Sequence, residues 1–157
     1  MEYKEQDVDT YFSVNLSGEV GWLSFDAPSL MGDSLRFVSG EKNGKRYRVH
    51  YYKDTNGQLC ARIWFGPDTE GPRGHSHGGA IAAVLDEALS LAACARGFSA
   101  VMGHLSVRFR NMLPLEHVVT VQTEVMSVKG RRVSVRGRIC LGKKIFAEAE
   151  GLCIVIS

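Results

Sequence analysis

One segment, residues 80–95, constrains the fold of this chain more than any other. Its sequence, AIAAVLDEALSLAACA, contains no Gly, Pro or Thr and consists mainly of strong helix formers, so it predicts a long α-helix. Apolar residues lie all the way round this helix, which is typical of a helix covered on most sides. With 157 residues, 45% of them hydrophobic and 23% charged, the chain fits one globular domain built around that helix.

The rest of the chain is rich in predicted strands. Two alternating runs between residues 46 and 65 flank Asn56-Gly57, a pair typical of a tight hairpin turn in which both central residues have positive φ. Four more strands are predicted after the helix, at residues 101–110, 118–128, 133–140 and 145–156. This order predicts an α+β domain over residues 46–157, with an antiparallel sheet curled round one long central helix. Residues 1–45 show little periodicity, and we interpret them as an irregular N-terminal arm.

Several classes of protein are disfavoured by the composition. No stretch approaches the roughly 20 apolar residues of a membrane-spanning helix, and the acidic start lacks a signal-peptide pattern, so we expect a cytoplasmic protein without a membrane partner. His75 and His77 lack further ligands at metal spacing, so no metal site is expected. The cysteines stand singly in apolar patterns and are interpreted as buried thiols: Cys60, Cys94, Cys140 and Cys153.

The predicted helix contains a carboxylate, Asp86, that needs a physical reason to be there. An unpaired buried carboxylate costs several kcal/mol, so it must be hydrogen-bonded, paired, protonated or facing a wet site. A catalytic role is one reason. Two alternatives remain open: Asp86 is held by a neighbouring chain or by Ser90 one turn on, or the working acid is Glu87, which projects about 100° away round the helix.

The glycine pair before the helix suggests a matching function. Helix N-termini present unpaired N–H groups and partial positive charge, and glycine lets a substrate approach the backbone closely. If the substrate is a thioester, the Gly78 N–H would form the oxyanion hole for its carbonyl oxygen. The alternative is that Gly78 and Gly79 only mark the start of the helix.

The distance between these two groups predicts an assembly. The eight residues from Gly78 to Asp86 rise roughly 12 Å along a helix. A base acting through one water must lie within about 6 Å of the carbonyl that is attacked. We therefore expect two antiparallel helices from two protomers to build each site across a two-fold axis.

The segment HGGAIAAVLDEALSLAA, with GPDTEGPRGHS before it and LSVRFRNMLP and VKGRR after it, resembles the hotdog-fold acyl-CoA thioesterase superfamily. The likeness covers about residues 46–157 and is greatest to the thioesterase superfamily member four and phenylacetate-degradation types. It implies a hotdog fold with a six-stranded sheet, homodimers or dimers of dimers, and hydrolysis of acyl-CoA to free acid and CoA by an aspartate-activated water. Coenzyme A enters as part of the substrate, so no separate cofactor is expected.

The resemblance also implies roles for individual residues. Asp86 matches the catalytic carboxylate, Gly78 the oxyanion glycine, and His77 the residue that shapes the helix start, with Gly79 beside them in the substrate-binding segment. Four basic residues match positions that bind coenzyme A, the first two in its groove and the last two at a turn that meets the nucleotide phosphates: Arg108, Arg110, Lys129 and Arg131.

Two positions depart from the family pattern. Relatives often have Ser or Thr near the attacking water where this chain has Met102, and some have Asn in the loop where this chain has Gly71. Both departures bear on how the water is positioned rather than on the thioester class.

A run of seven bases without an acid lies in the C-terminal third: Lys129, Arg131, Arg132, Arg136, Arg138, Lys143 and Lys144. It fits either a surface for a polyanion or the solvated face of a strand pair; we expect no nucleic-acid partner. Two rival functions stay open, a hotdog module that binds acyl-CoA without turnover and a dehydratase of 3-hydroxyacyl thioesters, although the acid–base pair of the latter is not evident.

Overall fold

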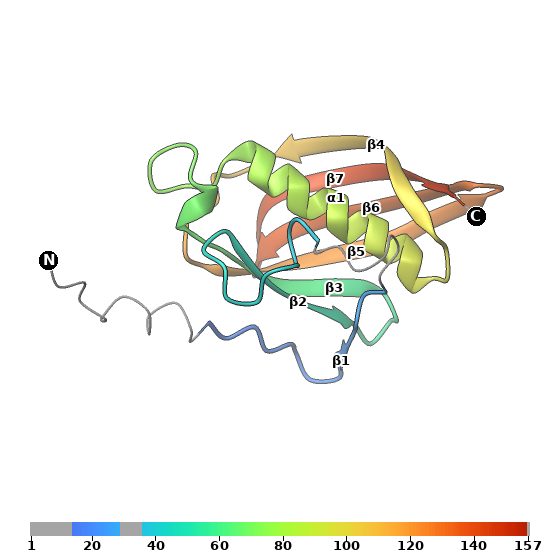
Figure 1. Ribbon diagram of the computed structural model, residues 1–157, viewed down its shortest axis with the longest axis horizontal. Helices are drawn as coiled ribbons and strands as arrows, with labels where there is room; N and C mark the ends of the chain where they lie inside the picture. The colour runs from blue at the N-terminus through green and yellow to red at the C-terminus, as the bar shows by residue number, and fades with distance from the viewer. Residues whose placement is uncertain (1–13, 29–35, 157) are drawn as a thin grey trace, which may run out of the picture.

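The computed structural model describes residues 14–28 and 36–156. Within them, one long helix lies across a seven-stranded antiparallel sheet (Figure 1). In chain order the elements are β1 (Leu23–Ser24), β2 (Tyr47–Lys53), β3 (Leu59–Phe65), the short 3-10 helix η3 (Pro67–Thr69), α1 (Gly78–Ala95), β4 (Ala100–Phe109), β5 (Val118–Lys129), β6 (Arg132–Leu141) and β7 (Lys144–Val155). The strand order is β1-β2-β3-β5-β6-β7-β4, so β4 forms one edge of the sheet. The predicted α+β arrangement of a sheet around one helix is confirmed.

The core lies between α1 and the concave face of the sheet. Leu85 and Leu89 of α1 are fully buried, and truncating such a leucine to alanine costs about 2–5 kcal/mol. By length and mean hydropathy (1.5) α1 could also cross a membrane, but half of it is buried here, as in the core helix of a globular domain. The four cysteines are all buried, as predicted. Burial raises the pKa of the Cys60 thiol to about 12 and that of Cys153 to about 11, so neither suits a nucleophile.

The β2–β3 hairpin is confirmed, but the expected turn geometry is wrong. The strands are joined by a loop of five residues, of which only Gly57 has positive φ (+76°). The Asp54 carboxylate organises this loop by accepting hydrogen bonds from the N–H groups of Asn56 and Gln58, both at 2.9 Å. A five-residue loop does not require positive φ at both Asn56 and Gly57, as a two-residue type I′ turn does.

Part of the N-terminal region covers the outer face of the sheet. Leu23 pairs with Lys53 through the short strand β1, and the Trp22 ring packs on Tyr52 with centroids 5.6 Å apart. Further along, Val38 is buried in the core. The described part of the arm is therefore mostly irregular but packed against the domain. The proposed boundary at residue 45 stays a prediction, and residues 1–13 and 29–35 lie outside the described residues.

Candidate active site

The start of α1 leaves one backbone donor available. His77 is the N-cap, in extended conformation, and its Nδ1 accepts a hydrogen bond from the Gly79 N–H at 2.8 Å. The carbonyl of His77 accepts from Ala80 at 3.0 Å and from Ile81 at 3.2 Å. The Gly78 N–H donates to no acceptor within the described chain. Among the donors of the first turn, Gly78 is thus the one left for an oxygen of a ligand.

The loop before α1 packs tightly against that first turn. A Cβ added to Gly71 would come within 2.7 Å of the His77 Cα, so only glycine fits without a shift of backbone. The His77 N–H donates to the Thr69 carbonyl at 2.6 Å and fixes the loop from the other side. The departure at Gly71 therefore has a structural reason: the backbone of the loop approaches the helix cap too closely for a side chain.

The Phe109 ring forms an apolar surface beside the Gly78 N–H. Phe109, the last residue of the edge strand β4, stands next to Gly78; a Cβ at Gly78 would lie 3.4 Å from its ring. The Phe109 side chain is 56% exposed, although it is large and apolar. An exposed aromatic ring beside an unpaired N–H makes a surface suited to an apolar ligand that carries a carbonyl.

Asp86 is exposed, so the expectation that it is buried is wrong for the single chain. The sheet does not cover the side of α1 that carries it, and within the described residues its carboxylate accepts no hydrogen bond and forms no ion pair. Partial desolvation by its surroundings nevertheless raises the pKa of Asp86. Ser90 does not hold it, and lies instead beside the Cys153 thiol.

Glu87, the alternative acid, is committed to other contacts. Its Oε2 accepts a hydrogen bond from the Tyr51 hydroxyl at 2.6 Å, and its Oε1 accepts from the Ser39 hydroxyl at 3.1 Å. This leaves Asp86 as the unpartnered carboxylate of α1. Sequence reasoning missed Tyr51, although a signal was present: a core-facing tyrosine needs a polar partner for its hydroxyl.

Gly78 and Asp86 do not meet within one chain. They lie on the same helix with a rise of roughly 12 Å between them. The edge strand β4 runs beside α1 (Figure 1). Within residues 14–28 and 36–156, no three His, Cys, Asp or Glu side chains gather in a group that could hold a metal ion.

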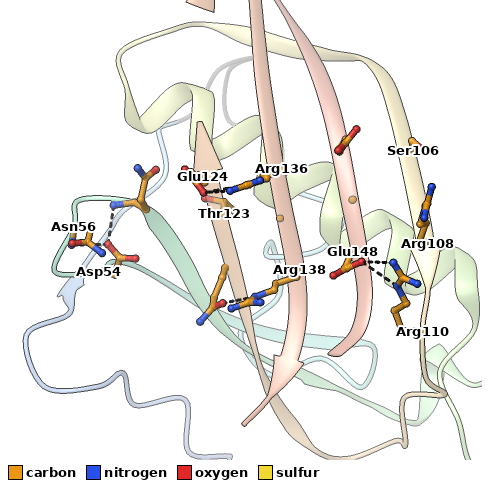
Figure 2. A pocket seen from close by; sticks show the side chains of 15 residues that line it. Asp54, Asn56, Ser106, Arg108, Arg110, Thr123, Glu124, Arg136, Arg138 and Glu148 are labelled. Atoms are coloured by element: carbon orange, nitrogen blue, oxygen red, sulfur yellow. Dashed lines mark hydrogen bonds and ion pairs between the residues drawn. The ribbon is translucent and has the colours of Figure 1, made fainter. Parts of the chain in front are cut away.

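Arg108 and Arg110 lie on the opposite face of the sheet from α1. Side chains alternate along a strand, and since Phe109 faces the helix, its two neighbours face outward. They line a groove of about 1090 Å³ on the outer face of the sheet, where Arg110 pairs with Glu148 at 2.9 Å (Figure 2). The structure thus does not bring these two arginines to Gly78 or Asp86.

This outer groove carries balanced charge. Its charged residues are Arg108, Arg110, Arg136 and Arg138 with Asp54, Glu124, Glu148 and Glu150. Arg136 pairs with Glu124 at 2.9 Å, and Arg138 donates to the Gln122 amide oxygen at 2.7 Å. Cross-strand pairs of this kind are typical of a solvated sheet face, which is one of the two interpretations given to the basic run.

Lys129 and Arg131 lie at the turn between β5 and β6. Gly130 between them has φ +58°, and the Arg131 Nε donates to the Val155 carbonyl at 2.9 Å. Val155 pairs with Ala100, which follows the end of α1. The basic turn is therefore at the opposite end of the domain from Gly78 of the same chain.

Comparison with known proteins identifies the family of this fold and site. The profile of the thioesterase superfamily matches residues 73–145, from the loop before α1 to the start of β7. The chain carries a thioesterase superfamily domain. Every residue to which the sequence resemblance gave a role lies inside this thioesterase superfamily domain. Tyr51 and Ser39, the partners of Glu87, lie before it.

Individual relatives agree with this assignment. The human acyl-coenzyme A thioesterase THEM5 is 29% identical over 98 residues, which are 62% of this chain and 39% of that protein. The acyl-coenzyme A thioesterase THEM4 of Xenopus laevis is 32% identical over 90 residues, 57% of this chain and 40% of that protein. The chain spans about two fifths of the length of these relatives.

A solved structure confirms the fold. The crystal structure of another thioesterase superfamily protein superposes with a TM-score of 0.68 at 29% identity, and the match covers 76% of this chain and 59% of the other. The resemblance to hotdog thioesterases and the predicted hotdog fold are both confirmed. The implied six strands correspond to β2–β7, to which the two-residue strand β1 is added.

Proposed function

We propose that this chain is an acyl-CoA thioesterase that hydrolyses thioesters to free acid and CoA. The observation that carries the proposal is the free N–H of Gly78: His77 occupies the Gly79 donor, and Gly78 alone remains directed to a ligand at the positive end of α1. A thioester carbonyl oxygen there gains negative charge as water attacks, and a fixed backbone donor stabilises that charge.

Asp86 is the proposed general base. Its carboxylate takes a proton from a water as the water oxygen attacks the carbonyl carbon. The tetrahedral intermediate then collapses, the C–S bond breaks, and the CoA thiolate leaves with its electron pair and takes up the proton held by Asp86, which restores the base. A carboxylate without other hydrogen-bond partners is suited to this task, since nothing within the described chain competes for its oxygens. Water is the second substrate, and the reaction needs no cofactor.

The proposed active species contains at least two copies of the chain. Gly78 of one copy and Asp86 of the other form a site when two α1 helices lie antiparallel across a two-fold axis, and the unpaired edge of β4 supports such a contact. In this arrangement, the basic turn with Lys129 and Arg131 of one copy lies at the same end as Gly78 of the other. That turn is the proposed contact for the phosphates of coenzyme A, and Gly79 lines the approach to the thioester.

The homodimer, or a dimer of such dimers, is proposed to act in the cytoplasm on acyl-CoA alone, with neither nucleic acid nor membrane as a partner. Arg108 and Arg110 stay proposed contacts of the coenzyme A groove. Their place on the outer face makes this role depend on how copies assemble, because one chain does not bring them to its own Gly78.

Release of free CoA tests the proposal. A thiol-reactive dye should report steady thiol formation from an acyl-CoA with the wild-type protein, and a rate lower by about 100-fold or more with Asp86→Asn. Glu87→Gln is the control: it neutralises the neighbouring carboxylate of α1 and should keep most of the wild-type rate. Binding of acyl-CoA without release of thiol by the wild type would identify a binding module and overturn the enzymatic function.

A further inference from the structure

Two tyrosine hydroxyls of β2 hold α1 at two separate points. The Tyr47 hydroxyl donates to the Ala80 carbonyl in the first turn of the helix at 2.9 Å. The Tyr51 hydroxyl donates to the Glu87 carboxylate, two turns further on, at 2.6 Å. Both tyrosines face the core, with 3% and 6% of their surface exposed. Their hydroxyls are therefore directed polar contacts inside an otherwise apolar layer.

The segment before β2 also holds the Glu87 side chain. Its Oε1 accepts from the Ser39 hydroxyl at 3.1 Å and from the Ser39 N–H at 3.4 Å. The neighbouring Val38 is buried in the core, which anchors this segment. Short O–H···O⁻ bonds belong to the stronger class of hydrogen bonds. Burial and the adjacent Glu87 carboxylate hold the pKa of Tyr51 well above its ordinary value, so the hydroxyl keeps its proton.

Each point of attachment lies next to a group of the proposed site. Ala80 is two residues after Gly78, and Glu87 directly follows Asp86. Successive residues project about 100° apart around a helix. Fixing Glu87 toward β2 therefore also fixes the direction in which Asp86 projects, while fixing Ala80 sets the direction of the Gly78 N–H.

We infer that the Tyr51–Glu87 hydrogen bond, with Tyr47 at the first turn, positions Asp86 and Gly78 by setting the rotation of α1. This inference rests on the proposed function, and it makes Tyr47, Tyr51 and Glu87 positioning residues that touch no substrate. Both tyrosines lie outside residues 73–145, so the thioesterase superfamily match does not include them.

The neighbouring tyrosine of the same strand provides a matched control. The Tyr52 hydroxyl donates to the Leu16 carbonyl at 2.6 Å, on the other face of the sheet and away from α1. Tyr51→Phe and Tyr52→Phe each remove one hydroxyl and one hydrogen bond. We expect Tyr51→Phe to lower kcat about tenfold with KM unchanged, because misplaced catalytic groups slow the chemical step. Tyr52→Phe should lower the urea midpoint less, because its acceptor is a neutral carbonyl, and should leave kcat at the wild-type value.

Substitutions at Glu87 separate positioning from plain stability. Glu87→Gln retains an acceptor for the Tyr51 hydroxyl and should keep most of kcat, whereas Glu87→Ala should lose about as much as Tyr51→Phe. If Tyr51→Phe reduces kcat no more than Tyr52→Phe does, the inference is overturned. The same holds if Glu87→Gln and Glu87→Ala lower kcat equally.

A measurement without turnover distinguishes failure of this inference from failure of the proposed function. Hydrogen–deuterium exchange of peptides covering residues 84–90 should be faster in Tyr51→Phe than in Tyr52→Phe, because the attachment of α1 is lost only in the first. If Tyr51→Phe exchanges faster than Tyr52→Phe but the wild type releases no CoA, the inferred positioning of α1 stands and the thioesterase function is rejected. Equal exchange in the two variants would reject the positioning whatever the activity.

Discussion

The His77 Nδ1 atom accepts a hydrogen bond from the Gly79 N–H at 2.8 Å, and this contact separates the roles of the two adjacent glycines. Gly79 uses its donor to cap the helix, so only Gly78 can offer one to a substrate. The separation leads directly to a substitution that removes one N–H group from the protein.

Gly78→Pro should keep the fold and lower kcat by about 100- to 1000-fold, the scale of losing one oxyanion donor. Gly78 is the first residue of α1, a position where proline is well accommodated, and the extended His77 before it suits a following proline. Gly78→Ala is the control: it adds a Cβ that meets Phe109 at an ordinary 3.4 Å and retains the N–H. Steady-state kinetics and circular dichroism of both variants check the prediction, and equal activity of the two would contradict it.

The raised pKa of Asp86 predicts a pH dependence of the rate. The base must be ionised to accept a proton, so kcat should fall as the pH drops through the raised value. This fall should lie above the ordinary aspartate pKa of about 3.9. A profile of kcat against pH measures it, and the residual rate of Asp86→Asn should lack the same fall.

The raised pKa of Asp86 also predicts that Asp86→Asn, which lowers the rate, stabilises the folded state. Because the folded state favours the protonated form, the ionised carboxylate destabilises it, and stability falls as pH rises through the raised pKa. Asp86→Asn should therefore unfold at higher urea than the wild type at pH 7.5. The difference should shrink towards pH 4. A variant less stable than the wild type at pH 7.5 would contradict the desolvation of Asp86.

Mixing of inactive variants tests whether two chains build each site. Asp86→Asn and Gly78→Pro, mixed equally and allowed to exchange, should regain about one quarter of wild-type activity. Half of the dimers are then hybrids, and each hybrid has one complete site of two. A site contained within one chain would give no recovery.

The converse mixture is a control for this result. Wild type mixed equally with the double variant should retain about one quarter of the all-wild-type activity if sites are shared between chains, because only pure wild-type dimers are active. It should retain about one half if each chain holds a complete site.

The basic turn should contribute to binding of coenzyme A rather than to chemistry. Lys129→Ala and Arg131→Ala should each raise KM for an acyl-CoA by about threefold with kcat unchanged, as expected for exposed charges. They should not alter KM for the same acyl group on pantetheine, which lacks the nucleotide. The preference for the CoA ester should also shrink as salt rises, since the charges are screened.

The next hairpin offers a matched control. Lys143 follows Gly142, which has φ +58° like Gly130, at the turn between β6 and β7. Lys143→Ala removes the same charge from the other end of the sheet. If it raises KM for the CoA ester as much as Arg131→Ala does, the effect is a general one of surface charge.

Local pattern was enough to predict the long helix and the six longer strands of this fold. The helix predicted at residues 80–95 is α1 with two residues added at its start, and the strands after it differ from prediction by at most one residue at each end. The reason is physical: apolar alternation and turn glycines act over short distances and are written directly in the chain. His77, Gly78 and Asp86 could be picked out for the same reason, as a helix start and an acid within one helix.

Other features depend on contacts between segments that are distant in the sequence, so only the tertiary structure decided them. Glu87 and Tyr51 are 36 residues apart, so no local pattern showed that one of two adjacent acids is already paired. A β-bulge between Met102 and His104 shifts the alternation of β4, and the face of Arg108 followed only once the strand was paired with β7. The exposure of Asp86 likewise depended on which side of α1 the sheet leaves uncovered. The sequence by itself determined which chemical groups are present and which helix or strand carries each of them. Packing determined which of these groups stay without a hydrogen-bond partner, because pairing joins residues that are distant in the sequence.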